Sequence, residues 1–339
     1  MTLGTYVTRQ DAFDALADAR SDGARGRFVD PSGARTRVER VVEQWWLTRA
    51  GHRVSTRYRD RQVLDDHLLP VLGQAQLAEL THAEVQAWVN RLASRYAPSS
   101  VRRNFTVLRQ VLDFAVDNGL LALNPSERIV LPRREQFEAR FLTPDELELL
   151  AATINPRSRA LVLVMAWATL RIGEAMGLRK IDLDLSAGRL RVANNLVEVE
   201  GHLHEGPPKT KAGRRAMTLP ASVVSDLRLH VMQFGNVPYV FTTATGKLWS
   251  PEDWRHRVWR PAVKKSGLAP LRPHDLKHTG VALLAAAGVD PSEIARRAGH
   301  SSVAFTYDRY GHLFPEVDSG AAAKLDGLRR TGLRSIADL

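Results

Sequence analysis

The chain has 339 residues, of which 44% are hydrophobic and 25% charged, so it is long enough for two or three folded domains. It contains no cysteine, which excludes a disulfide framework and a cysteine-ligated zinc site. Its 48 basic and 37 acidic side chains give a net charge of +11, which favours a polyanionic partner such as nucleic acid. The longest apolar run, Ala160 to Leu170, is too short to cross a bilayer, and no signal peptide is visible, so we expect a cytoplasmic protein with no membrane partner.

The first segment, residues 1–35, is predicted to be an N-terminal appendage. Thr8 is placed to cap a short amphipathic helix through Ala19, and the run from Phe28 to Pro31 closes the segment.

Residues 36–122 are predicted to form a small bundle of four helices. Apolar residues from Val38 to Trp46 recur at helical spacing, and Ser55 is expected to cap a second helix that stops at Pro70. Thr81 and Glu84 predict a capped third helix, and Ser99 or Ser100 opens a fourth that ends before Gly119.

Residues 123–141 contain Pro125, Pro132 and a charged run, which predicts an extended linker. Residues 142–315 then begin at a capping box formed by Thr143 and Glu146. Helices are expected before residue 170 and after Pro220, with strands between residues 189 and 219. Residues 316–339 are a C-terminal tail.

Chemistry-bearing residues gather in the second half of the chain. Arg171 stands in a Leu-Arg-Ile-Gly-Glu string that ends at Glu174, and about a hundred residues later His274 and Lys277 share one face at the start of a helix. His300 follows a glycine, and Tyr310 lies ten residues beyond it. Breaking a phosphodiester without a metal needs a nucleophile, fixed positive charge on the phosphate oxygens and a proton donor for the leaving oxygen, and the chain has candidates for each.

These strings closely resemble those of the tyrosine recombinases, the phage integrase family. The resemblance implies a mainly α fold with a small β-sheet in an α+β catalytic domain, preceded by a helical, SAM-like core-binding bundle. It also implies site-specific DNA recombination through a 3′-phosphotyrosyl bond, without metal or other cofactor. The implied partners are double-stranded DNA, a homo-tetramer on paired sites, and accessory DNA-bending or directionality factors; the tail is a candidate for docking onto a neighbouring protomer. For residues 1–35 the resemblance leaves two alternatives open, a remnant of the family's arm-binding domain and a simple appendage.

The resemblance also assigns roles. Tyr310 is the expected nucleophile, with Tyr307 as a rival one helical turn away. Arg171 is expected on the scissile phosphate with Glu174 in support, while His274 assists proton transfer and His300 donates to a phosphate oxygen. A lysine from a hairpin should protonate the leaving oxygen. Lys209, in Pro-Lys-Thr, fits better than Lys211, which would share its face if the strand is regular.

Lys277 departs from the family pattern, which has a second arginine there. Lysine keeps the charge but cannot hold two phosphate oxygens at once. The change therefore leaves open an alternative, a DNA-binding protein on the same fold whose cleavage is attenuated or lost. A second alternative is a metallohydrolase built on His274, His278, His300 and His312, but it leaves Arg171, Lys209 and Tyr310 unexplained.

Further arginines are candidates for contacts with DNA phosphates, because they cluster on elements of a basic chain. In the helical bundle they are Arg57, Arg59, Arg61, Arg102, Arg103 and Arg109; in the basic hairpin they are Arg214 and Arg215.

Overall fold

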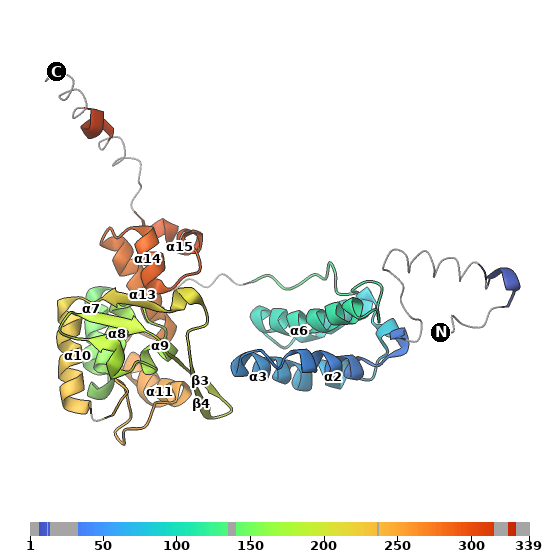
Figure 1. Ribbon diagram of the computed structural model, residues 1–339, viewed down its shortest axis with the longest axis horizontal. Coiled ribbons are helices and arrows are strands. Elements are labelled where there is room, and N and C mark those ends of the chain that lie inside the picture. The colour runs from blue at the N-terminus through green and yellow to red at the C-terminus, as the bar shows by residue number, and fades with distance from the viewer. Residues whose placement is uncertain are drawn as a thin grey trace. The chain divides into compact units, whose positions relative to one another are not determined.

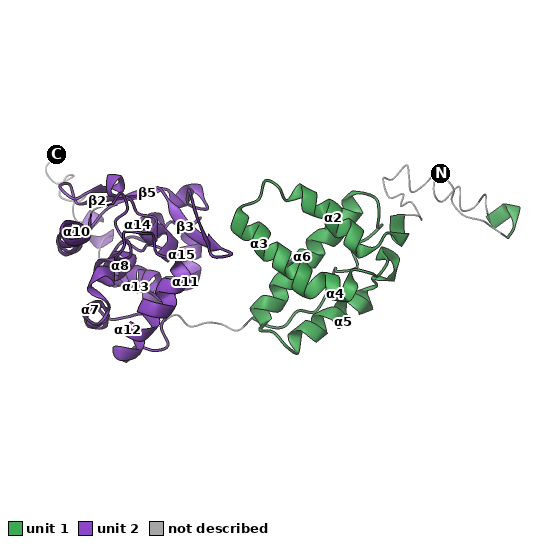
Figure 2. Ribbon diagram, turned by 90° about the horizontal axis from the view of Figure 1, so that it is seen from below, with its two compact units in different colours: residues 1–137 green, residues 138–339 purple. Residues whose placement is uncertain are grey.

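The computed structural model describes residues 7–11, 13, 33–134, 140–235, 237–314 and 325–329. The chain divides into two compact units between residues 137 and 138, each with its own hydrophobic core (Figure 2). Most of the expected appendage, 1–35, and of the tail, 316–339, lies outside the described residues, as does the run from Phe28 to Pro31. Of the helix expected to run to Ala19, residues 9–11 and 13 are described and are helical. At Thr8 the hydroxyl does accept the Asp11 amide, at 3.2 Å.

The first unit is the expected helical bundle, shown in Figure 1. Its helices are α2 (Val38–Thr48), α3 (Val54–Val63), α4 (Leu69–Leu72), α5 (His82–Ala93) and α6 (Pro98–Asp117). Its core is made of the apolar faces of these helices, with Trp88 1% exposed and its indole N–H bonded to the His67 carbonyl at 3.1 Å. Thr81 caps α5 by accepting the Glu84 amide, and Gly119 ends α6 with a φ of 69°, as predicted.

Three helix boundaries in this unit differ from expectation. Ser55 does not cap the second helix, because α3 begins at Val54 with Arg53 as its N-cap residue. The second helix does not stop at Pro70, because a π-helical turn, Leu64–Leu68, precedes the short α4, and Pro70 then falls in the first turn of α4. The fourth helix begins at Pro98 rather than at a serine cap. Pro98 occupies a first turn, where the amide hydrogen that proline lacks has no partner within the helix. At Pro70 the helical stretch continues, because the Leu69 amide bonds to the Leu64 carbonyl across the π-helical turn.

The expected linker is only partly extended. Asn124 donates to Asp113 at 2.5 Å, Ser126 is 1% exposed, and the Pro132 carbonyl accepts from Arg102 at 3.0 Å. Residues 124–132 therefore pack against the helices of the first unit and belong to it.

The second unit contains most of the helices and all of the strands that the structure describes. The helices are α7 (Pro144–Thr153), α8 (Pro156–Trp167), α9 (Ile172–Met176), α10 (Ala221–Phe234), α11 (Pro251–Trp254), α12 (Arg260–Lys265), α13 (Pro273–Ala286), α14 (Pro291–Ala298) and α15 (Val303–Tyr310). The strands are β1 (Leu183–Asp184), β2 (Arg189–Val192), β3 (Asn195–Val199), β4 (His202–Gly206) and β5 (Arg215–Thr218). The combination agrees with the expected mainly α fold with a small sheet.

The strands form two small antiparallel sheets. One has the order β1-β2-β5 and the other is the β3-β4 hairpin. In the first sheet Val192 pairs with Arg215 and Leu190 with Met217. Turns at Gly188 and Gly201 have positive φ values of 64° and 73°, which glycine adopts without steric cost.

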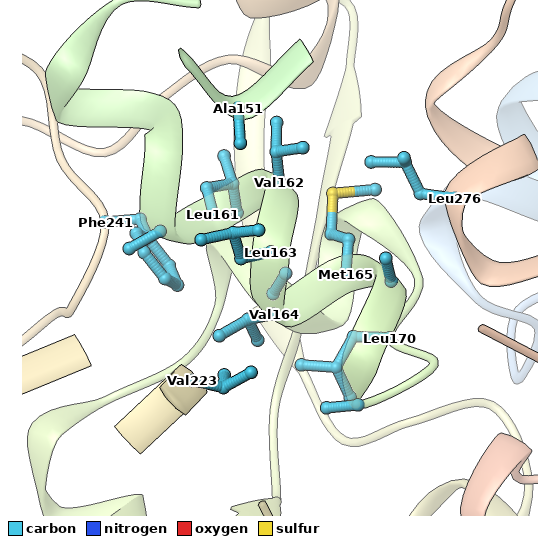
Figure 3. Close-up of a cluster of buried hydrophobic side chains, with 14 of the residues drawn as sticks. Ala151, Leu161, Val162, Leu163, Val164, Met165, Leu170, Val223, Phe241 and Leu276 are labelled. Atoms are coloured by element: carbon cyan, nitrogen blue, oxygen red, sulfur yellow. The ribbon is translucent and has the colours of Figure 1, made fainter. Parts of the chain in front are cut away.

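The core of this unit surrounds α8, whose residues Ala160–Ala166 are all at most 3% exposed (Figure 3). A helix buried on all sides explains why the apolar run of the sequence is continuous rather than periodic. The capping box at Thr143 is present, with both reciprocal hydrogen bonds to Glu146. Within the described ranges no helix is long and apolar enough to span a bilayer.

Helices α8 and α13 approach each other closely at Gly280. A Cβ atom built there would overlap the Ala166 carbonyl oxygen and lie 2.9 Å from Thr169 Cγ2. Because one contact is with backbone, a side-chain rotation cannot relieve it. The close approach matters because α8 leads directly to Arg171 and α13 carries His274 and Lys277.

We predict that Gly280→Ala lowers the free energy of unfolding of the second unit by about 1–3 kcal/mol. Alanine favours helix by up to about 1 kcal/mol relative to glycine, but the forced separation of α8 and α13 outweighs that gain. Urea denaturation combined with hydrogen exchange of α8 and α13 measures the change. Gly311→Ala is the control, because no atom lies within 4 Å of the added Cβ. Equal stabilities for the two variants would contradict the prediction.

Candidate active site

Arg171 is presented by a sharp turn between α8 and α9. Thr169 ends α8 in the left-handed conformation, with φ 51°, and Arg171 is the N-cap residue of α9. Its Nη1 donates to Glu174 Oε1 at 2.7 Å, and its amide donates to Oε2 at 3.1 Å. The Arg171 side chain is 42% exposed whereas that of Glu174 is 2% exposed, so the arginine retains an open face toward a ligand.

Glu174 contacts a second arginine, which corrects one sequence prediction. Arg215 was expected to touch phosphates from an exposed hairpin; instead its side chain is 3% exposed and pairs with Glu174 at 3.0 Å. Burial raises the pKa of the Glu174 carboxyl, but Arg215, Lys277 and Arg171 outweigh it and leave the pKa below its usual range. The expectation failed because strand alternation, which places Arg215 inward with Met217, prevailed over the preference of a charged side chain for solvent.

His274 and Lys277 lie at the start of α13, as predicted. Lys277 is 3% exposed and its Nζ donates to the Ala298 carbonyl. Burial, followed by the nearby positive charge of Arg171, lowers the Lys277 pKa to about 7. Desolvation of the His274 ring, followed by the charges of Lys277 and Arg171, lowers its pKa to about 4, although part of the residue stays open to solvent.

His300 follows α14, whose end is fixed by Gly299 at a φ of 64°. Its Nδ1 is 2.8 Å from the Thr306 hydroxyl, and its ring stacks on Tyr310 with centroids 6.1 Å apart and planes at 6°. Burial and then the charge of Lys277 lower the His300 pKa to about 4. His300 is therefore neutral at pH 7 and keeps Nε2 available for another partner.

Tyr310 ends α15 and is almost completely buried, at 1% exposure. Its hydroxyl hydrogen-bonds to His278 Nδ1, and burial raises its pKa to about 12. Tyr307, the rival nucleophile, is 48% exposed and packs its ring against Phe314, with centroids 5.5 Å apart. Tyr310 is therefore the tyrosine that lies among the candidate histidines.

His278 was considered in the sequence only as a metal ligand, and its contact with Tyr310 was missed. Its position four residues after His274 places it on the same face of α13, and the two rings meet edge to face at 4.7 Å. Burial, followed by His274, lowers the His278 pKa to about 4. Within the part of the chain that the structure describes, no group of three or more His, Asp or Glu side chains is placed to hold a metal ion.

Lys209 and Lys211 are both exposed and lie in the connection from β4 to β5. The regular strand assumed for them is wrong, because Lys211 begins a 3₁₀ turn, Lys211–Gly213, capped by the Thr210 hydroxyl. The two lysines therefore do not share a strand face. Arg214, just after this turn, is exposed as expected.

The candidate phosphate-binding arginines of the first unit lie on α3 and α6. On α3, Arg57 and Arg61 stack on the Trp46 ring at 5.3 and 5.7 Å, and Arg61 also pairs with Asp65. On α6, Arg109 is 3.9 Å from Asp113. Even so, the Arg61 and Arg109 side chains are 46% and 52% exposed, and Arg59 and Arg103 are exposed as well.

Solved structures share this fold. The Tn1549 transposon integrase superposes with a TM-score of 0.74 at 18% identity, covering 86% of this chain and 99% of that one. The lambda integrase gives a TM-score of 0.65 at 16% identity, covering 89% of this chain and 83% of that one.

Sequence comparison gives closer relatives. The integrase of Mycobacterium phage L5 is 32% identical over 267 residues, which are 76% of this chain and 71% of the phage protein. The ICEBs1 integrase of Bacillus subtilis is 26% identical over 79% of this chain and 76% of its own length. Residues 140–316 match the phage integrase family and residues 38–130 match the phage integrase central domain. The chain therefore belongs to the phage integrase family and is a tyrosine-type site-specific recombinase.

Proposed function

We propose that this recombinase cuts one DNA strand with Tyr310 while Arg171, Lys277 and His300 hold the scissile phosphate. The observation that carries the proposal is the convergence of separate elements: α9 supplies Arg171, α13 supplies Lys277, and the His300 ring stacks on Tyr310. Arginine and lysine supply the positive charge that a phosphate needs as it becomes five-coordinate.

In the proposed cleavage step the Tyr310 oxygen attacks phosphorus and passes its proton to His278, to which it is hydrogen-bonded, while the bond from phosphorus to the 5′ oxygen breaks. Lys209 donates a proton to that oxygen, which leaves a 3′-phosphotyrosyl bond and a free 5′-hydroxyl. The 5′-hydroxyl of a partner strand then attacks the phosphotyrosyl bond and restores a phosphodiester, so no nucleotide is consumed.

The neutral histidines fit this chemistry. His274 and His278, with pKa values lowered to about 4, are uncharged at pH 7 and can accept a proton. A bound phosphate adds negative charge beside them and raises those pKa values toward neutrality. His278 already contacts the Tyr310 hydroxyl, and His274 contacts His278.

We propose double-stranded DNA as the substrate and partner, in line with the net charge of +11. The exposed arginines of α3 and α6, together with Arg214, would contact its phosphates. The Tn1549 integrase was solved in complex with a circular intermediate DNA, and the lambda integrase as a tetramer bound to a Holliday junction. By analogy we propose that four protomers act on two sites, with integration or excision of a mobile element as the outcome and with accessory factors choosing its direction.

Trapping of the covalent protein–DNA adduct tests whether Tyr310 is the nucleophile. Tyr310→Phe should abolish the covalent protein–DNA adduct on a nicked suicide substrate, because it removes the attacking oxygen, and should retain DNA binding. Tyr307→Phe is the matched control and should still form the adduct. Denaturing gel electrophoresis measures the adduct. An adduct from Tyr310→Phe, with none from Tyr307→Phe, would reverse the assignment.

The proton donor is tested by changing the leaving group. Lys209→Ala should slow cleavage by roughly 100-fold or more, the usual contribution of general acid catalysis. A 5′-bridging sulfur leaves as a thiolate without a proton and should restore the rate. Lys211→Ala, two residues away on the same connection, is the control. If Lys211→Ala is the variant that sulfur rescues, Lys211 is the donor.

The lowered pKa of Lys277 predicts that the rate of cleavage depends on pH, and substitution by arginine should remove that dependence. With a pKa of about 7 in the free enzyme, Lys277 is charged below that pH and neutral above it, so kcat/KM for cleavage should fall as the pH rises through about 7. Lys277→Arg stays charged and should lose that fall, whereas Lys277→Ala should be slow throughout. Single-turnover rates at sub-saturating enzyme across neutral and alkaline pH test this. An unchanged profile for Lys277→Arg would show that Lys277 does not set it.

A further inference from the structure

Arg215 is a buried cation that the proposed reaction does not use. It begins β5, its side chain is 3% exposed, and its guanidinium makes hydrogen bonds in several directions. Nε donates to the Arg297 carbonyl at 2.5 Å, Nη1 to the Gly213 carbonyl at 3.0 Å, and Nη2 to Glu174 Oε2 at 3.0 Å and to the Thr169 carbonyl at 3.3 Å.

Each of the three carbonyl acceptors lies a few residues along the chain from a residue of the candidate site. Thr169 is two residues before Arg171, and Gly213 closes the turn that follows Lys209. Arg297 lies three residues before His300, and its carbonyl also accepts the Thr169 hydroxyl at 3.0 Å. A single guanidinium therefore ties together the three segments that present the phosphate clamp, the proton donor and the stacking histidine.

The guanidinium is closely packed where Gly299 lies. A Cβ at Gly299, whose φ is 64°, would make tight contacts of 3.0 Å with Arg215 Nη1 and 3.1 Å with the Ala212 carbonyl oxygen. The planar fork of arginine suits this set of fixed acceptors, and a lysine ammonium could reach only some of them.

The charge of Arg215 has a separate consequence. Glu174 is shared, with Oε1 bonded to Arg171 and Oε2 to Arg215. Arg215 and Lys277 both stabilise the charged form of this carboxylate, and among these four groups Arg171 has the most exposed side chain, at 42%. Without Arg215, the charge of Glu174 would offset more of the charge of Arg171 and weaken its hold on a phosphate.

We propose that Arg215 is a positioning residue for DNA cleavage: it neutralises Glu174 and fixes the three segments, so that the charge of Arg171 stays available to the scissile phosphate. The proposal rests on the function proposed above.

A double-mutant cycle with Glu174 tests it by single-turnover cleavage of a nicked suicide substrate. Arg215→Met should slow cleavage by roughly 100-fold or more, the usual effect of losing preorganised charge stabilisation. In the Glu174→Gln background, which has no carboxylate to neutralise, the same change should cost less than about tenfold. Equal losses in the two backgrounds would show that Arg215 acts independently of Glu174 and would overturn the proposal.

Arg189→Met is the matched control, because it removes one positive charge from an exposed position on β2 of the same sheet. It should slow cleavage far less than Arg215→Met. DNA-binding affinity and thermal unfolding are measured for each variant. If Arg215→Met weakens binding as much as cleavage, Arg215 serves binding instead and the proposal fails.

Arg215→Lys covers the case in which Arg215→Met does not fold, since it keeps a charge beside Glu174. Because the neutralising charge is kept, Arg215→Lys should slow cleavage by less than about tenfold, and a loss of roughly 100-fold or more would overturn the proposal. Failure of the proposed function is recognised separately, because wild-type protein would then form no adduct through Tyr310 on the same substrate.

Discussion

The buried carboxylate of Glu174 is the point on which the catalytic unit depends. An ionised carboxyl at 2% exposure is costly unless it is paired, and it is paired on both oxygens, by Arg171 and by Arg215. The first of these pairs holds the exposed cation at the head of α9, and the second anchors the carboxylate to the sheet and to α14. The buried ion pair of Glu174 and Arg215 thus lies beneath Arg171, and the positive charge of Arg171 stays open at the surface.

Backbone constraints complete this arrangement. Thr169 adopts a left-handed conformation that few non-glycine residues take, and its carbonyl and hydroxyl are both held by neighbours. Gly280 allows α13 to lie against the Ala166 carbonyl near the end of α8. Together they set the spacing between the helix that leads to Arg171 and the helix that carries Lys277.

Much of this could be read from the sequence, and the exceptions have physical causes. The capping box at Thr143, the glycine that ends α6 and the chemistry-bearing residues of α9, α13 and α15 are signalled locally, by residue type and spacing. The burial of Arg215 is not, because a charged residue in a basic run normally faces solvent. Its alternation with Met217 and Leu219 was the available signal, and only the position of Glu174, far away in sequence, explains why a cation is tolerated there. His278 was missed for a similar reason, since its partner Tyr310 lies 32 residues away.

The enclosure of Tyr310 has a consequence for specificity. On the proposal that Tyr310 is the nucleophile, its side chain has to become more exposed before it attacks a phosphate, because the residue is 1% exposed and its hydroxyl is hydrogen-bonded to His278. Opening the surroundings of Tyr310 costs free energy. A DNA segment offsets that cost only through contacts that are stronger in the opened form. Sequences that bind weakly or in the wrong register would thus be held without being nicked. On this proposal the enzyme binds many DNA segments without cleaving them, and cleaves only those whose contacts are strong enough to expose Tyr310.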